Sequence, residues 1–343
     1  MSAQENSVEN VDSLETEKSE TKMKKESIVP LTIALVLGAI VAVLIAGCSN
    51  DLPVASQLER TRVLGARVEV ATDPGRADVS PGEAALVSWI VAGPSAPATL
   101  DWAFALCTTA GGDCKDAPQP IATGSGAPVS VAFTTPDAAA LVNNQLPMMI
   151  GVVCADGTIG FDPSTALGTC TGADASGTTV RFVVPVTPAG ETPNHHPAFT
   201  NDVIEFAGAT WDAATAVAGD PCDATTGLPV VTATPDGQDA IKQEIRIVSD
   251  GDDRETFTPR GKTVAQLEDL QISNFTTAGK FESSYAAIFA TDTRPDADVT
   301  VKWEPPAAST VPAGGEIVTF QWVVRDLRGG LDVVSRSLCL VRP

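Results

Sequence analysis

The sequence contains few of the residue types on which metal binding and acid–base catalysis depend. It has two histidines, adjacent at His195 and His196, and one tyrosine among 343 residues. No two cysteines have the C-x2-C spacing, so the sequence disfavours a zinc site. Both imidazoles lie in one proline-rich stretch, so the sequence does not indicate a Ser-His-Asp triad.

Positive charge is also scarce. The chain has 22 lysines and arginines against 43 aspartates and glutamates, which gives a formal net charge of −21. Such a chain repels a polyanion, so we expect no nucleic-acid partner. The same charge leaves cations as candidate ligands.

Long helical patterns are nearly absent, and aromatic residues make up only 5% of the chain. Short apolar runs rich in valine, threonine and alanine alternate with glycine and proline, which is typical of strands and turns. The stretch 263–272 fits either a short helix or a strand. The expected strands are 66–72, 84–93, 98–106, 128–135, 148–157 and 178–186, then 201–211, 228–234, 243–249, 285–291, 298–303, 316–326 and 331–341.

This spacing of strands predicts an all-β fold with two immunoglobulin-like antiparallel β-sandwich domains. The glycines of Leu327-Arg328-Gly329-Gly330 predict a hairpin between the last two strands. A Gly-Glu pair stands six residues before a tryptophan at both Gly82 and Gly315. One copy opens the first domain and the other lies near the end of the second, so we interpret them as similar strand starts and not as a duplication.

The proline-rich stretch 185–197 predicts a boundary between the domains, because proline fixes φ and removes a backbone donor. Its two histidines are then expected in a solvated turn. The predicted organisation is a disordered tail at 1–26, a hydrophobic signal segment at 27–47, a lipidated tether at 48–57, a first sandwich at 58–186, a linker at 187–197 and a second sandwich at 198–343.

The segment 27–47 has no charged residue and is long enough to span a bilayer as a helix. It ends in Ile45-Ala46-Gly47-Cys48, which resembles the bacterial lipobox. The resemblance implies cleavage before Cys48 and a mature chain held in the bilayer by acyl chains on that cysteine, palmitate among them. The alternative is that the segment stays in the membrane, uncleaved, as a single-pass helix that happens to end in this motif. Translation from Met23, which precedes two lysines, would give a more usual export signal than translation from Met1.

The lipobox resemblance places the protein in the bacterial cell envelope. Ser49 is compatible with transfer to the outer membrane, whereas an aspartate there favours retention in the inner membrane. The expected partners are the lipid bilayer, through acylated Cys48, and an unknown envelope protein or glycan.

An even number of cysteines in an exported chain predicts disulfides. Four lie in the first half, which allows three pairings, and pairing between neighbours is the simplest. The remaining two would then join the beginning of the second half to its last strand. The six are Cys107, Cys114, Cys154, Cys170, Cys222 and Cys339. Cys170 also stands in Gly-Thr-Cys-Thr-Gly, which has the form of a nucleophile elbow but lacks a following helix.

Two acidic loops give a calcium hypothesis, because calcium prefers carboxylate oxygens from flexible loops. A complete ligand motif is missing, and solvated turns explain the same residues. We therefore expect no cofactor beyond this candidate calcium. The candidate ligands are Asp250, Asp252, Asp253, Glu255, Asp296 and Asp298.

The five tryptophans divide into two groups by their place in the predicted strands. Trp89, Trp102 and Trp322 lie in mid-strand beside apolar residues and are expected in the core. Trp211 and Trp303 lie near strand ends and are expected to be the more exposed.

Three pieces of the chain carry a family resemblance: "TRVLGARVEVATDPGRADVSPGE" from Thr61, "FTTAGKFES" from Phe275 and "FQWVVRDLRGGLDVVSRSLCLV" from Phe320. After a lipobox, they resemble uncharacterised lipoproteins of myxobacterial type. That family has no established activity, so no functional residue carries over. The main hypothesis is a non-enzymatic structural or adhesive lipoprotein. A carboxylate-based hydrolase of envelope polymers and a calcium-stiffened surface protein are the alternatives.

Overall fold

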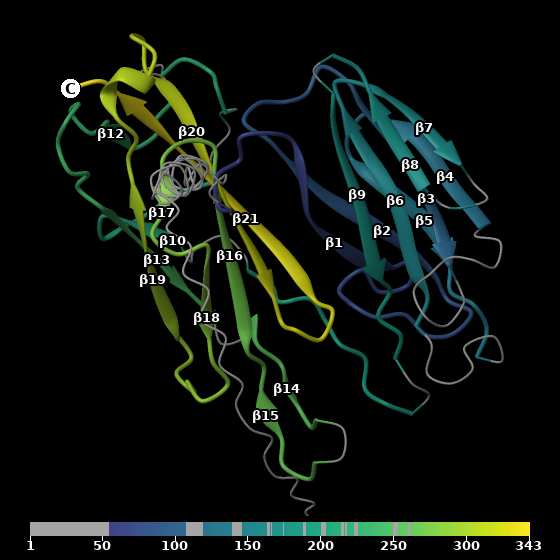
Figure 1. The fold of residues 1–343 in the computed structure, drawn as a ribbon. Coiled ribbons are helices and arrows are strands. Elements are labelled where there is room, and N and C mark those ends of the chain that lie inside the picture. The colour runs from purple at the N-terminus through teal and green to yellow at the C-terminus, as the bar shows by residue number, and fades with distance from the viewer. Residues whose placement is uncertain are drawn as a thin grey trace, which may run out of the picture. The chain divides into compact units, whose positions relative to one another are not determined.

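The computed structural model describes residues 55–107, 119–138, 146–162, 165, 167–173, 175–187, 190–199, 204–213, 216, 218–222, 226–249, 253–259 and 262–343. All of them belong to one compact unit, Pro53–Pro343. They form strands and turns with one short 3-10 helix, Ala308–Thr310, and no α-helix within the described ranges (Figure 1). The all-β prediction is confirmed. The predicted domain limits stay predictions.

A first sandwich is built from two antiparallel sheets with the strand orders β1-β2-β5 and β4-β3-β6-β9. A hairpin of β7 and β8 lies against it. The strands are β1 (Arg62–Val70), β2 (Ala84–Ala92), β3 (Leu100–Cys107), β4 (Gln119–Ser125), β5 (Val129–Thr134), β6 (Met148–Ala155), β7 (Thr158–Asp162), β8 (Leu167–Thr171) and β9 (Ser176–Val183).

A second sandwich has the strand orders β11-β10-β13-β19-β17 and β12-β21-β20-β16-β18, with a separate β14-β15 ribbon. The pairs are antiparallel except β12 with β21. The strands are β10 (Ile204–Phe206), β11 (Ala209–Thr210), β12 (Val230–Thr232), β13 (Gln243–Val248), β14 (Thr256–Phe257), β15 (Gln266–Leu267), β16 (Leu270–Thr276), β17 (Lys280–Phe281), β18 (Tyr285–Ile288), β19 (Asp298–Glu304), β20 (Glu316–Arg325) and β21 (Leu331–Val341).

The two sandwiches use their strands in the same order. The set β1-β2-β5 corresponds to β10-β13-β19, and the set β4-β3-β6-β9 corresponds to β18-β16-β20-β21. The two Gly-Glu pairs therefore open different members of the pattern, since one precedes β2 and the other β20. Gly82 and Gly315 both have positive φ, 79° and 74°, which explains why glycine stands at each turn.

Alternation of apolar residues places one face of each strand in a core. In β1 and β16 every second residue is buried, as the sequence pattern predicts. Apolar side chains from both sheets of the first sandwich form one core cluster, and those of the second sandwich form another. The stretch 263–272 contains strands β15 and the start of β16, so its strand interpretation is the correct one.

The expectation for Trp211 and Trp303 is wrong. Their exposed fractions are 2% and 0%, and both lie in the core of the second sandwich. Each indole N–H donates to a backbone carbonyl, that of Ser337 for Trp211 and that of Ala278 for Trp303. Both rings pack against Phe320, more than ten residues away in sequence, and a local pattern does not reveal such a contact.

Candidate functional site

The predicted lipidation residue, Cys48, lies outside the described residues, as do the tail and the hydrophobic segment. Within the described residues, no helix is long and apolar enough to cross a membrane.

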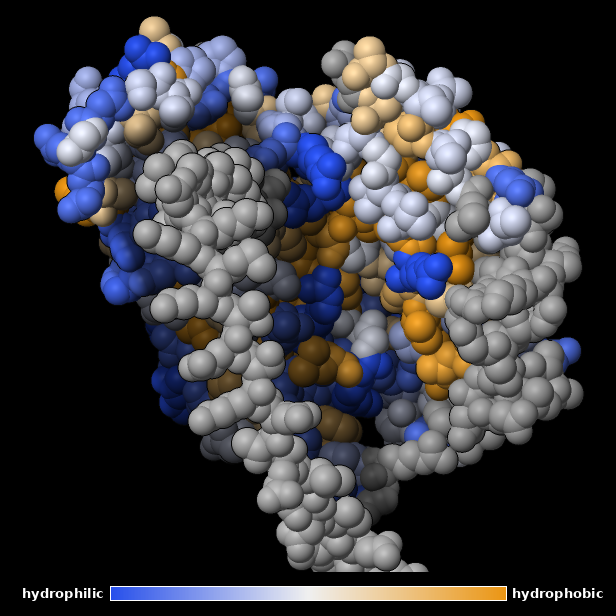
Figure 2. All heavy atoms as spheres, viewed as in Figure 1, coloured by the Kyte–Doolittle hydropathy of each residue, from blue (hydrophilic) through white to orange (hydrophobic). Residues whose placement is uncertain are grey.

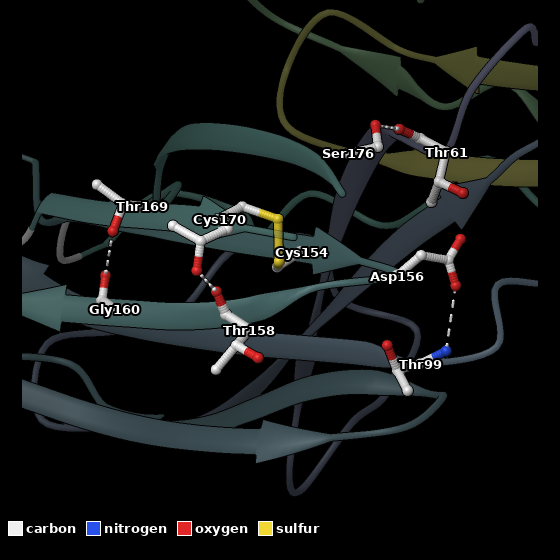
Figure 3. Close-up of a disulfide and its surroundings, with 10 residues drawn as sticks. Thr61, Thr99, Cys154, Asp156, Thr158, Gly160, Thr169, Cys170 and Ser176 are labelled. Atoms are coloured by element: carbon white, nitrogen blue, oxygen red, sulfur yellow. Dashed lines mark hydrogen bonds between the residues drawn. A yellow bond between two sulfur atoms is a disulfide. The ribbon is translucent and has the colours of Figure 1, made fainter. Parts of the chain in front are cut away.

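The predicted disulfides are largely present. Cys154 bonds to Cys170 and ties β8 to β6, and hydrogen bonds from Thr169 and Thr171 to carbonyls of β7 complete the hairpin (Figure 3). Cys222 bonds to Cys339 on β21, as expected. Cys107 is also disulfide-bonded, while its expected partner, Cys114, lies outside the described residues. Since Cys170 is in a strand and in a disulfide, it is not a nucleophile here.

Two of the described calcium candidates, Asp298 and Glu255, pair with basic side chains. Asp298 contacts Arg246 at 2.9 Å and Arg294 at 3.2 Å, while Glu255 contacts His195 and Arg328. Asp296 is exposed, and Asp253 is buried. Asp250 and Asp252 lie outside the described residues. Among the described residues, no group of three or more possible ligands is close enough to hold a metal.

The opening and closing motifs of the sequence, about 260 residues apart, meet between the two sandwiches. Arg67 on β1 donates to the Leu331 carbonyl at 3.0 Å and to Asp332 at 3.2 Å. Arg325 on β20 donates to the Leu64 carbonyl at 2.6 Å. We call this region the junction. A separate apolar cluster fills it, formed by Leu58, Leu64, Ala92, Val323 and Leu331.

His196 is buried in the junction, so the prediction of a solvated turn is wrong for this residue. Its Nε2 donates to the Val68 carbonyl at 2.5 Å, and its Nδ1 accepts from the Leu331 N–H at 3.0 Å. Burial, assisted by the Arg67 guanidinium, lowers the pKa of His196 to about 4. A neutral imidazole therefore links a strand of the first sandwich to a strand of the second.

Asn194 and Asp326 form a second link. The Asn194 side chain donates to Asp326 at 2.7 Å, and its backbone N–H donates to Asp78 at 3.0 Å. Asp326 also accepts from the N–H groups of Arg328 and Gly330, which shapes the hairpin between β20 and β21. The carboxylates of Asp78 and Asp326 are buried, so their hydrogen bonds favour one arrangement of the two sandwiches.

Glu268, 1% exposed, lies behind Arg328 and accepts from its guanidinium and from the Glu255 N–H. Burial raises the pKa of Glu268 to about 7, because desolvation outweighs both hydrogen bonds. Arg328 also stacks 4.2 Å from the centre of the Phe257 ring. His195 pairs with Glu255 at 2.6 Å, so this polar cluster continues from the hairpin to the segment that was expected to be a linker.

A cleft of about 580 Å³ opens beside the junction. Residues 63–66 of β1 line one side and residues 178–182 of β9 line the other, and the hairpin between β20 and β21 closes one end. Trp89 and Arg325 complete the lining. Figure 2 shows hydrophobic surface in the hollow beside β1 on this face. We call this the β1–β9 cleft.

Sequence reasoning missed the junction and the cleft. The motifs "RVLG" and "VRD-RGG", which form them, were identified only as part of a family resemblance. A usable signal was the density of arginine, aspartate and glycine in the closing hairpin, since buried charged residues need partners.

Comparisons with known proteins add little. No protein-family model matches the chain, and no curated protein matches its sequence. Among solved structures, it is similar to dimeric latent PorU from Porphyromonas gingivalis, with 10% identity and a TM-score of 0.18 over 84% of this chain and 34% of PorU. The chain thus spans about a third of that protein's length, and a TM-score this low carries no argument.

Proposed function

We propose that this chain is a lipid-anchored protein of the bacterial cell envelope, at the outer membrane, that binds another macromolecule without transforming it. The anchor part of the proposal rests on the lipobox at Ile45-Ala46-Gly47-Cys48 and on Ser49. The binding part rests on one observation, the open β1–β9 cleft between two sheet edges.

The use of the reactive side chains supports binding over catalysis. His196 bridges the sandwiches, His195 pairs with Glu255, and Cys170 is oxidised. Each of these three groups already has a structural partner, as a nucleophile or base awaiting a substrate would not.

A hydrolase is the second candidate, and one observation favours it. Glu268 has a pKa near neutrality and lies beside Glu255, as a general acid beside a carboxylate would. However, Glu268 is 1% exposed and both its oxygens accept hydrogen bonds. A substrate cannot reach it without displacement of Arg328, so the carboxyl suits a structural role better.

We also propose that both sandwiches are immunoglobulin-like. The shared strand order and the parallel pairing of β12 with β21 support this.

Mass spectrometry of the membrane-extracted protein tests the anchor. We expect an N-terminus at Cys48 with the mass of acyl chains, and an unprocessed chain after Cys48→Ser. A wild-type chain that retains residues 27–47 would contradict the anchor and indicate a membrane span.

Incubation of the purified chain with envelope peptide and glycan fractions tests binding without turnover. We expect a fraction to be retained and recovered with unchanged mass. Recovery of shortened products, lost in Glu268→Gln, would support the hydrolase instead.

A further inference from the structure

We infer that the β1–β9 cleft binds an extended acidic segment of another protein, which adds to the β9 edge as a strand. This inference rests on the proposed binding function and names the class of its partner.

Two sheet edges border the β1–β9 cleft. Among the described residues, strand β9 pairs only with β6 and β1 pairs only with β2, so each lies at the edge of its sheet. An edge strand presents N–H and C=O groups of alternate residues without a ladder partner. After the end of β9, a single β-bridge joins Val186 to Val79. At the start of β9, the Ser176 hydroxyl donates to the Thr61 carbonyl. Residues 178–182 between these contacts line the cleft.

The second sandwich shows what such an edge accepts. There, β12 pairs in parallel with the outer edge of β21 through Val230, Val231 and Thr232. Strand β21 occupies the place in its sheet that β9 occupies in the first sandwich. The fold therefore accommodates an added strand at this position.

Positive charge lines the β1–β9 cleft. Arg181 on β9 and Arg325 on β20 both line the cleft. Neither forms an ion pair with a carboxylate among the described residues. Arg325 is part-buried, with its contacts made to the Leu64 carbonyl and the Ser273 hydroxyl. Two uncompensated guanidinium groups in a chain of net charge −21 favour a ligand with carboxylates.

The alternation of β9 predicts the pattern of the ligand. Val180 is buried and Phe182 half-buried on the core side, whereas Thr179, Arg181 and Val183 are exposed. A strand added beside β9 keeps the same period of two. Its inward residues would contact the apolar lining, which includes Trp89, a residue 6% exposed whose indole N–H has no partner. Its outward residues would lie beside Arg181, so the recognised segment alternates apolar and acidic residues.

A fluorescent peptide of alternating valine and glutamate, added to the full chain in detergent, tests the inference by anisotropy. We expect saturable binding that weakens with added salt, and no binding of the valine–lysine peptide. N-methylation of every second backbone amide of the peptide should abolish binding, because it blocks strand pairing. Hydrogen exchange should slow at residues 178–182 on binding.

Charge reversal locates the site. Arg181→Glu, at an exposed position, should weaken peptide binding at least tenfold, whereas the matched control Arg60→Glu, also exposed but outside the cleft lining, should change it less than twofold. Equal effects of the two variants, or exchange protection at another edge such as β18, would overturn the inference.

The same variants separate this inference from the proposed function. If envelope fractions bind the chain and Arg181→Glu leaves that binding unchanged, the chain is a binding protein and the cleft is not its site. If no fraction and no peptide binds, both proposals fail. If sedimentation shows a dimer that Arg181→Glu dissociates, the occupant is a second copy of the chain, and the inference of a foreign partner is wrong.

Discussion

Aromatic rings fill the core of the second sandwich, whereas valines fill most of the first. Phe320 lies 5.0 to 5.9 Å, between ring centres, from Trp211, Phe281, Trp303 and Trp322. In the first sandwich the rings are fewer, and Trp89 stacks on Phe104 at 4.7 Å. The same strand order is thus stabilised in two ways. The sandwich with the smaller side chains carries the added β7–β8 hairpin, its disulfide and the open cleft.

The Cys222–Cys339 and Cys154–Cys170 disulfides give the largest expected difference. Replacement of Cys222 and Cys339 by alanine should lower the free energy of unfolding by about 5 kcal/mol, because the bond closes a loop with a sequence separation of 117. Replacement of Cys154 and Cys170, separated by 16, should cost about 3 kcal/mol. Denaturant titration of both double variants measures this. Equal losses would mean that loop length does not set the difference.

A matched pair of core variants tests the aromatic contrast. Phe320→Ala should cost about 5 kcal/mol, because the deletion removes contacts with four rings. Phe104→Ala removes an equally buried ring with two aromatic neighbours among the described residues, Trp89 and Trp102, and should cost about 3 kcal/mol. A larger loss for Phe104→Ala, measured by the same titration, would reverse the comparison.

Acid should loosen the link between the sandwiches. Because the pKa of His196 is lowered from 6.5 to about 4, the stability that neutral His196 provides is complete above pH 6.5 and is lost as the pH falls through 4. We expect a loss of up to about 3 kcal/mol over this range.

His196→Gln is the control for this titration, because an amide can donate to Val68 and accept from Leu331 without titrating. The acid-dependent loss should be smaller in this variant by the amount assigned to the imidazole. Identical pH profiles of the two chains would show that His196 does not titrate in this way.

A rise in pH from 5 to 8 should lower the free energy of unfolding by a smaller amount, through Glu268. Its pKa is raised from 4.5 to about 7, so the stability it contributes is complete below pH 4.5 and is lost as the pH rises through 7. We expect a loss of roughly 2–3 kcal/mol between pH 5 and 8. Melting curves of Glu268→Gln should lack this slope, and a slope that persists would assign it to another group.

The sequence predicted the strands wherever alternation was strong. Strands β2, β5, β20 and β21 and the hairpin before Leu331 agree with the expected ranges. The β7–β8 hairpin was missed, because its Gly/Thr-rich residues alternate weakly. It fits there because Gly168 packs against Val152 of β6, where a side chain would clash.

The site was less predictable than the fold. Each contact of the junction joins residues far apart in sequence, such as Arg67 with Asp332, and no local period reports such a contact. The stretch 185–197 predicted a linker because it has four prolines and no apolar periodicity. Asn194 and His196 are instead buried, because each meets a hydrogen-bonding partner from the hairpin.

The pairing of residues 56–58 with Thr276 has a consequence for the order of synthesis. Leu58 donates to the Thr276 carbonyl at 2.8 Å, and the Thr276 N–H donates to the Ser56 carbonyl at 2.9 Å. The ribosome adds Thr276 roughly 220 residues after Ser56 and Leu58, and it adds the hairpin that covers Leu64 later still. The first residues of the compact unit thus reach their final place only when the chain is nearly complete. A chain that ended before Thr276 would leave the Leu58 N–H and the Ser56 carbonyl without these partners, and an exposed terminal segment of this kind is open to proteolysis.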